Sequence, residues 1–208
     1  MLAPFRAMID AQIACEATQA NHRGRRPRPP KPPSPRALSP LHDRAPDVVC
    51  VIGEASSWPR PRGGEAPAWP EEIIQWVAHR PSTGETFEAL IAPEHPLAPG
   101  TAAQTGLSAD DVLHGEPRAH ALQRWRAFVR DTDVICSWGV FGTGLLEAAG
   151  AYLPAERVDL RRVARAEANG NVGSAGEYLQ RLGGPLEGIE PIGRGRAGER
   201  LGRIAAVA

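Results

Sequence analysis

Prolines dominate the segment from residue 21 to residue 46, where the chain reads HRGRRPRPPKPPSPRALSPLHDRAPD over residues 22–47. Proline has no backbone N–H and holds φ fixed, so a segment with this many prolines continues neither a helix nor a central strand. The composition therefore predicts an extended, disordered linker rich in Pro and Arg. Residues 47–208 remain, and they are enough for one α/β domain.

The segment before the linker, residues 1–20, has the apolar spacing of an amphipathic helix. Leu2, Phe5, Met8, Ile9 and Ile13 recur at intervals that place them on one helical face. Nothing within this short segment could cover that face. We therefore interpret it as a possible remnant of an upstream domain.

Charge is unevenly distributed along a chain whose formal net charge is zero. Residues 1–47 carry eight basic and four acidic side chains, a net charge of +4, whereas residues 48–208 have a net charge of −4. The basic side chains of the linker could contact the phosphates of a nucleic acid, for which RNA is the expected partner. The candidate nucleic-acid-binding residues are Arg23, Arg25, Arg26, Arg28, Lys31 and Arg36. The alternative is a solvated tether without a ligand.

Several classes of protein are excluded by missing patterns. No run reaches the roughly 18 to 20 apolar residues of a membrane span, and no signal peptide is present, so we expect a cytoplasmic protein without membrane partners. Three scattered cysteines predict neither disulfides nor structural zinc. The single Lys31 excludes a phosphate-binding loop of the Gly-Lys-Ser type. No cofactor and no metal site are therefore expected.

The order of apolar runs predicts an α/β fold with a mixed β-sheet. Short runs rich in β-branched residues predict strands, and residues 81–84 between two of them predict a hairpin. We expect the runs at 48–52, as a central strand, and at 134–137 to share one sheet. The strands are predicted over residues 47–55, 71–80, 84–93, 131–139 and 157–160, and helices over 101–113, 119–130, 141–152, 174–182 and 196–206.

Four motifs of the predicted domain occur in an order that resembles a known family. The motifs are IGEASSW at residues 52–58, TGL at 105–107, CSWGVFG at 136–142 and GRAGER at 195–200. In this order they resemble the DEDDh (DnaQ-like) three-prime-to-five-prime exonucleases over residues 47–208. The resemblance implies a ribonuclease-H-like mixed β-sheet flanked by helices.

The catalytic positions that the resemblance implies are largely replaced. In that family, four carboxylates bind two divalent ions, and a histidine acts as the general base. Here Ile52, Gly142 and Arg200 stand where Asp is expected, Gly195 stands where His is expected, and only Glu54 is retained. A guanidinium in place of a ligand opposes metal binding. We therefore expect a catalytically degenerate domain, not an enzyme, that binds RNA or acts as a scaffold, with Glu54 facing Arg200.

Two alternatives stay open at this point. Other carboxylates, such as Glu199, Asp133 or Asp159, could make a weak or cryptic exonuclease that needs a divalent metal. Separately, residues 3–23 resemble the terminal helix of DTW-domain tRNA-uridine aminocarboxypropyltransferases, without their Asp-Thr-Trp signature. That resemblance would make the chain a C-terminal appendage of a longer tRNA-modifying fusion.

Overall fold

The computed structural model describes residues 44–59, 63 and 65–208. The predicted helix at residues 1–20, nearly all of the Pro/Arg-rich linker and its six basic candidates lie outside the described residues. The resemblance to DTW-domain proteins rests on the same part of the chain. These expectations therefore stay predictions.

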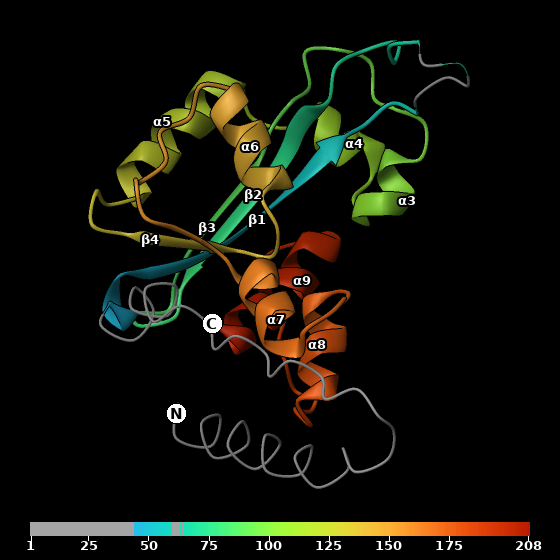
Figure 1. Ribbon diagram of the computed structural model, residues 1–208. Helices are drawn as coiled ribbons and strands as arrows, with labels where there is room; N and C mark the ends of the chain where they lie inside the picture. Colours follow the sequence, from blue (N-terminus) through green and yellow to red (C-terminus); the bar gives the residue numbers. More distant parts are fainter. Residues whose placement is uncertain (1–43, 60–62, 64) are drawn as a thin grey trace, which may run out of the picture.

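A mixed five-stranded sheet forms the centre of the fold, in the order β3-β2-β1-β4-β5 (Figure 1). β1 pairs antiparallel with β2 and parallel with β4, and Val48 of β1 lies opposite Val134 of β4. This pairing confirms the prediction that the two apolar runs share one sheet with the first run at its centre. The strands are β1 (Val48–Ser56), β2 (Glu72–Arg80), β3 (Glu85–Leu90), β4 (Val134–Ser137) and β5 (Arg157–Asp159).

Helices cover both faces of this sheet (Figure 1). Within the described ranges, none of them is long and apolar enough to cross a lipid bilayer. The helix predicted over residues 141–152 ends earlier, at Ala148, and is followed by Gly150 at φ 93°. The helical elements are η1 (Ala45–Asp47), α3 (Thr101–Thr105), α4 (Ala109–Leu113), α5 (Arg118–Phe128), α6 (Phe141–Ala148), α7 (Leu160–Ala168), α8 (Ala175–Arg181) and α9 (Gly195–Val207).

Alternation along β1 explains why the core has two halves. Successive strand side chains point to opposite faces, so Val49 and Val51 pack with residues of α5 and α6, whereas Val48 and Cys50 pack with residues of α8 and α9. Continuing this alternation places Ile52 and Glu54 on the α9 face and Gly53 on the α6 face. The period of the strand thus decides which helix each candidate site residue meets.

The cysteines of the sheet are buried and chemically quiet. Cys50 and Cys136 lie opposite each other on β1 and β4, and both are fully buried. Burial raises the pKa of the Cys50 thiol well above its usual value and raises the pKa of Cys136 to about 12. Both side chains therefore remain protonated near neutral pH and act as core residues.

The helix α7 was not predicted from the sequence. Asp159 ends β5 and its carboxylate accepts a hydrogen bond from the backbone N–H of Arg162, so it is the N-cap of α7. The same carboxylate accepts a hydrogen bond from the N–H of Gly139 at 3.0 Å. Asp159 therefore connects the loop after β4 to the first turn of α7.

Candidate functional site

A pocket of about 650 Å³ opens beside the carboxyl ends of the parallel strands β1 and β4. Its walls come from these strand ends, the first turn of α6, Arg161 of α7, the beginning of α8 and the middle of α9. Ligands of open α/β sheets commonly bind outside the carboxyl ends of strands. Four of the five positions singled out by the sequence line this pocket: Ile52, Glu54, Gly142 and Arg200.

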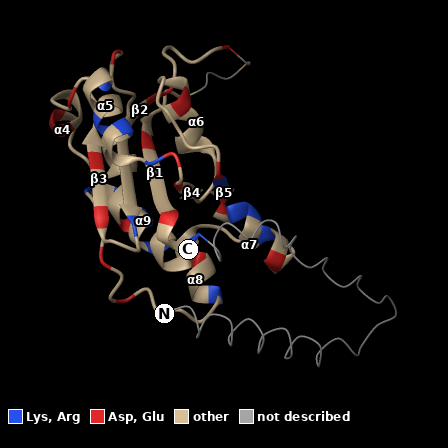
Figure 2. Cartoon of the chain, turned by 90° about the vertical axis from the view of Figure 1, so that its left-hand side faces the viewer, with Lys and Arg blue, Asp and Glu red and all other residues tan. Residues whose placement is uncertain are grey.

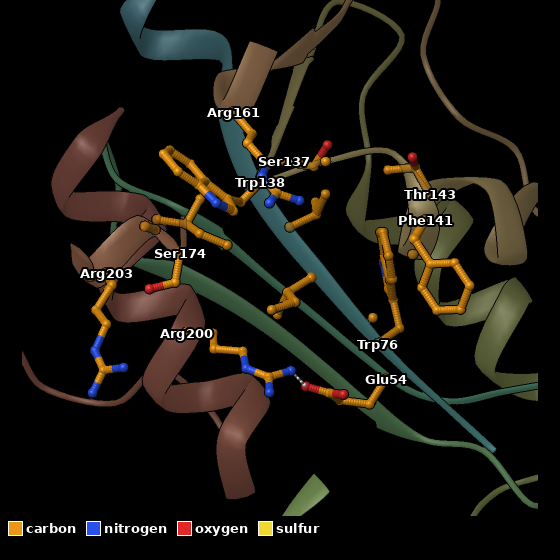
Figure 3. Close-up of a pocket in the computed structure, with 18 of the residues that line it drawn as sticks. Glu54, Trp76, Ser137, Trp138, Phe141, Thr143, Arg161, Ser174, Arg200 and Arg203 are labelled. Atoms are coloured by element: carbon orange, nitrogen blue, oxygen red, sulfur yellow. Dashed lines mark hydrogen bonds and ion pairs between the residues drawn. The ribbon is translucent and has the colours of Figure 1, made fainter. Parts of the chain in front are cut away.

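Glu54 and Arg200 form an ion pair within the pocket (Figure 3). Arg200 Nη1 donates to Glu54 Oε1 at 2.6 Å. The Glu54 side chain is 11% exposed and that of Arg200 is 47% exposed, so the pair lies at the boundary between the pocket and solvent. Ile52, two residues before Glu54 on the same face of β1, packs against the hydrophobic core beneath α9.

The retained carboxylate is held in an environment that disfavours its charge. Burial is the largest influence and raises the pKa of Glu54 from its ordinary value of 4.5. Arg200 opposes this shift through its charge and its hydrogen bond, and the charge of Arg196 opposes it further. Desolvation outweighs these cations, so the ion pair does not stabilise the ionised carboxylate fully.

Gly142 lies too close to β1 to be replaced by a metal-binding side chain. A Cβ atom at Gly142 would be 2.9 Å from the backbone N of Gly53. Gly53 in turn rests on Trp76, whose ring would be 3.0 Å from a Cβ at that position. The first turn of α6 therefore packs backbone to backbone on β1.

Gly195 lies outside the pocket lining. It has φ +59°, a conformation that side-chain-bearing residues rarely adopt, and a Cβ there would be 2.5 Å from the carbonyl oxygen of Thr105. It begins α9 and packs against the end of α3 and Leu107. The position to which the family resemblance assigns a histidine is thus occupied by a glycine that the local backbone requires.

The substitute carboxylates do not assemble a metal site. Asp133 lies before β4, at the opposite end of the strand from the pocket, and forms a buried ion pair with Arg80. Asp159 is used as an N-cap, and Glu199 is exposed and outside the pocket lining. In the described part of the chain, no group of three His, Cys, Asp or Glu side chains could hold a metal ion. The residues present do not fit two divalent cations.

Several pocket residues were missed by the sequence reasoning. Arg161, Arg203, Trp138 and Phe141 all line the pocket and have side chains suited to binding an anion or an aromatic ring. Arg161 was missed because α7 was not recognised. The usable signal was an aspartate at the N-cap followed by the helical spacing of Leu160, Val163 and Ala164, which occurs within residues 159–164.

Solved structures with a similar fold include nucleases. The nuclease domain of 3′hExo, a DEDDh family member bound to rAMP, superposes with a TM-score of 0.58 over 77% of this chain and 88% of that chain at 16% identity. The fold is that of DEDDh-type 3′-exonucleases. The cell-death related nuclease CRN-4 gives a TM-score of 0.58 at 12% identity, covering 77% of this chain and 61% of that chain. Pop2p of S. pombe gives 0.56 at 16% identity, covering 83% and 84%.

Sequence comparison supports the exonuclease fold over a shorter stretch. The PolC-type DNA polymerases III of Streptococcus pneumoniae and Streptococcus mutans are 30% identical to this chain over 80 residues, or 37% of it. That stretch spans about 6% of the length of these polymerases. No family model matches the chain. The likeness to this exonuclease fold therefore concerns its architecture.

The raised pKa of Glu54 should make the free energy of unfolding depend on pH. Because its pKa is raised in the folded state, the folded protein binds more protons than the unfolded chain between pH 4.5 and the raised value. Its contribution to stability is therefore present below pH 4.5 and is lost as the pH rises through the folded pKa. We expect Glu54→Gln, which does not ionise, to gain stability relative to the natural chain as the pH increases from 4 to 7.

Urea unfolding of both proteins at a series of pH values measures this difference. Glu65→Gln is a suitable control because Glu65 is exposed. If Glu54→Gln instead lost stability relative to the natural chain as the pH increased, the effect of Arg200 on the pKa of Glu54 would be larger than the effect of burial.

Proposed function

We propose that this chain is a non-hydrolysing module with an exonuclease fold that binds nucleic acid, preferably RNA. The observation that carries the proposal is the Glu54–Arg200 ion pair, which occupies the place where the resemblance implies metal-binding carboxylates. A permanent cation 2.6 Å from the single retained carboxylate competes directly with any divalent ion for it. Fold similarity alone does not bring the chemistry, because function resides in the site.

The surroundings of the ion pair support the same proposal. Gly142 and Gly195 have no space for carboxylate or imidazole side chains without movement of backbone. Without metal-bound hydroxide and charge neutralisation, the in-line attack on a phosphodiester loses its principal sources of acceleration. The pocket is open, so it can bind nucleic acid without the residues that hydrolysis requires.

The basic linker residues form the second part of the proposal. Arg23, Arg25, Arg26, Arg28, Lys31 and Arg36 would add contacts to phosphates that depend on ionic strength. Such contacts are independent of sequence and position a strand without reading its bases. RNA held by the linker would be presented to the folded domain.

We expect no release of nucleotides from single-stranded RNA or DNA by the full chain, with Mg²⁺ or with Mn²⁺. Nuclease assays with product analysis by gel and mass spectrometry measure this directly. Glu54→Gln is the necessary control, since a contaminating nuclease would be unaffected by it. Metal-dependent release by the natural chain that disappears in Glu54→Gln would instead establish the weak or cryptic exonuclease.

A further inference from the structure

The pocket is positively charged, opposite to the carboxylate-lined site that its fold implies. Among the described residues that line it, Arg161, Arg200 and Arg203 are basic and Glu54 is the one carboxylate. Full ionisation would give this group a net charge of +2, and the raised pKa of Glu54 works in the same direction. A site of this kind attracts anions without the help of metal ions.

Arg161 is positioned in the pocket but has no partner for its Nε. This atom is buried and makes no hydrogen bond with any residue that the structure describes. A buried donor without an acceptor costs free energy, so such an atom indicates a missing acceptor. Asp159, the N-cap of α7, fixes the helix turn from which Arg161 projects. The side chain therefore has a defined position and an unused capacity to donate.

Arg200 also keeps donors available. Only its Nη1 is engaged with Glu54, which leaves Nε and Nη2 without a partner among the described residues. In Figure 3, Arg161 and Arg200 lie on two sides of the pocket, while Arg203 lies farther out beside Ser174. A planar guanidinium presents paired N–H groups that match the oxygens of a phosphate.

The domain also has an excess of positive charge in the part of the chain that contains α7, α8 and α9, and an excess of negative charge in the rest. Residues 160–208, which include α7, α8 and α9, contain eight arginines and five glutamates, a net charge of +3. Residues 48–159 contain eight arginines and fifteen acidic residues, a net charge of −7. Figure 2 shows the basic bands of α7 and the acidic bands of β3 on separate parts of the molecule. The acidic balance of the domain therefore does not apply to the pocket side, and binding need not depend on the linker alone.

We propose that this pocket binds the phosphate of a nucleotide directly on Arg161 and Arg200, without a metal ion, either as a free nucleotide or at the end of a strand. This inference rests on the proposed function and specifies its ligand. The guanidinium groups would supply the charge neutralisation that metal ions supply in nucleases, but no activated water. A bound phosphate would therefore be held and not transferred.

Aromatic side chains beside the arginines suit the rest of a nucleotide. Phe141 is 54% exposed and lines the pocket at the start of α6. Trp138 lines the opposite part, where its indole N–H donates to the carbonyl of Gly173 at 3.0 Å and fixes the ring. Bases stack on exposed aromatic faces with little dependence on sequence. We expect the phosphate to bind the arginines and the base to stack against Phe141.

The test is binding to the full chain in the presence of EDTA. Calorimetry with adenosine 5′-monophosphate and with adenosine shows whether the phosphate is required for binding. Fluorescence anisotropy with a short single-stranded RNA, with and without a terminal phosphate, shows whether the ligand is a free nucleotide or the end of a strand. Arg161→Gln should weaken phosphate binding by at least about tenfold, because it removes a charge-assisted hydrogen bond. Glu54→Gln should strengthen binding, because it removes a repelling charge.

Arg162→Gln is the matched control, since Arg162 is adjacent on α7, exposed and outside the pocket lining. It should change the affinity by less than about twofold, as expected for a screened surface charge. Thermal unfolding of each variant confirms the fold, and Arg161→Lys retains the charge if Arg161→Gln proves unstable. Equal effects of Arg161→Gln and Arg162→Gln, or binding that EDTA abolishes, would overturn the inference. If the chain neither binds nor hydrolyses these ligands, the inference about the nucleotide phosphate is wrong, but the proposed function is not. If the chain hydrolyses them, the proposed function is wrong.

Discussion

Replacing Asp133 with alanine should lower the free energy of unfolding by about 3–5 kcal/mol, because it removes the buried counterion of Arg80 and leaves that guanidinium only the half-exposed Glu85 as a partner. Arg80 and Asp133 are both fully buried at the side chain, and Arg80 Nη1 lies 2.5 Å from Asp133 Oδ1. Asp133 Oδ2 also accepts from Arg80 Nη2 at 3.0 Å and from the backbone N–H of Arg130 at 2.8 Å. Three hydrogen bonds are lost together in the variant.

Denaturant unfolding measures this change, with Asp131→Ala as the matched control. Asp131 lies two residues earlier and pairs with Arg126, but its side chain is 71% exposed, so its loss should change stability by less than about 1 kcal/mol. Replacing Arg80 and Asp133 together by apolar residues of similar volume should restore much of the stability, because no charge then stays buried. Similar losses for Asp133→Ala and Asp131→Ala would contradict the burial of the pair.

Gly142→Asp should destabilise the fold by about 1–3 kcal/mol, although Asp is the residue type that the resemblance to the exonuclease family implies at this position. The new Cβ would approach the backbone N of Gly53 to 2.9 Å, and neither α6 nor β1 can move without disturbing the core above Trp76. Thermal and urea unfolding measure the loss. Gly144→Asp is the matched control, since a Cβ at Gly144 on the same helix meets nothing within 4 Å.

The crowding at Gly142 and Gly195 also affects a variant that carries all four residue types implied by the family resemblance. Ile52→Asp, Gly142→Asp, Gly195→His and Arg200→Asp together should not bind Mn²⁺ tightly, because Gly142 and Gly195 lack room for side chains. Calorimetric titration with Mn²⁺ tests this expectation. Tight binding by the combined variant, together with equal stability of Gly142→Asp and Gly144→Asp, would show that the helix can move to rebuild the metal site.

Local sequence patterns were sufficient to predict the sheet and part of the site. Apolar runs of β-branched residues predicted the central strand and its neighbour, because burial on both faces leaves little choice of residue. The strand period places Ile52 and Glu54 on one face, and the resemblance to the exonuclease family led to the expectation that Glu54 faces Arg200. The structure adds the distance of 2.6 Å between them.

Other features were beyond the sequence because they depend on contacts between distant segments. The sequence shows glycine at positions 142 and 195, but only the packing of α6 on β1 and of α9 beside Thr105 shows that a side chain has no room there. The acidic total of the domain likewise concealed the basic pocket, since total charge contains no information about position.

The sequence by itself determined the order and type of most strands and helices, and it shows that four of the five catalytic residue types implied by the family resemblance are absent from the positions compared. The tertiary structure decided what replaced that chemistry. It brought Arg161 of α7 and Arg200 of α9 to the ends of β1 and β4, although Arg200 is 146 residues from its partner Glu54 in the sequence. The physical reason is that secondary structure follows from local periodicity, whereas a binding site is a sum of charges and volumes from elements that meet only in the folded chain.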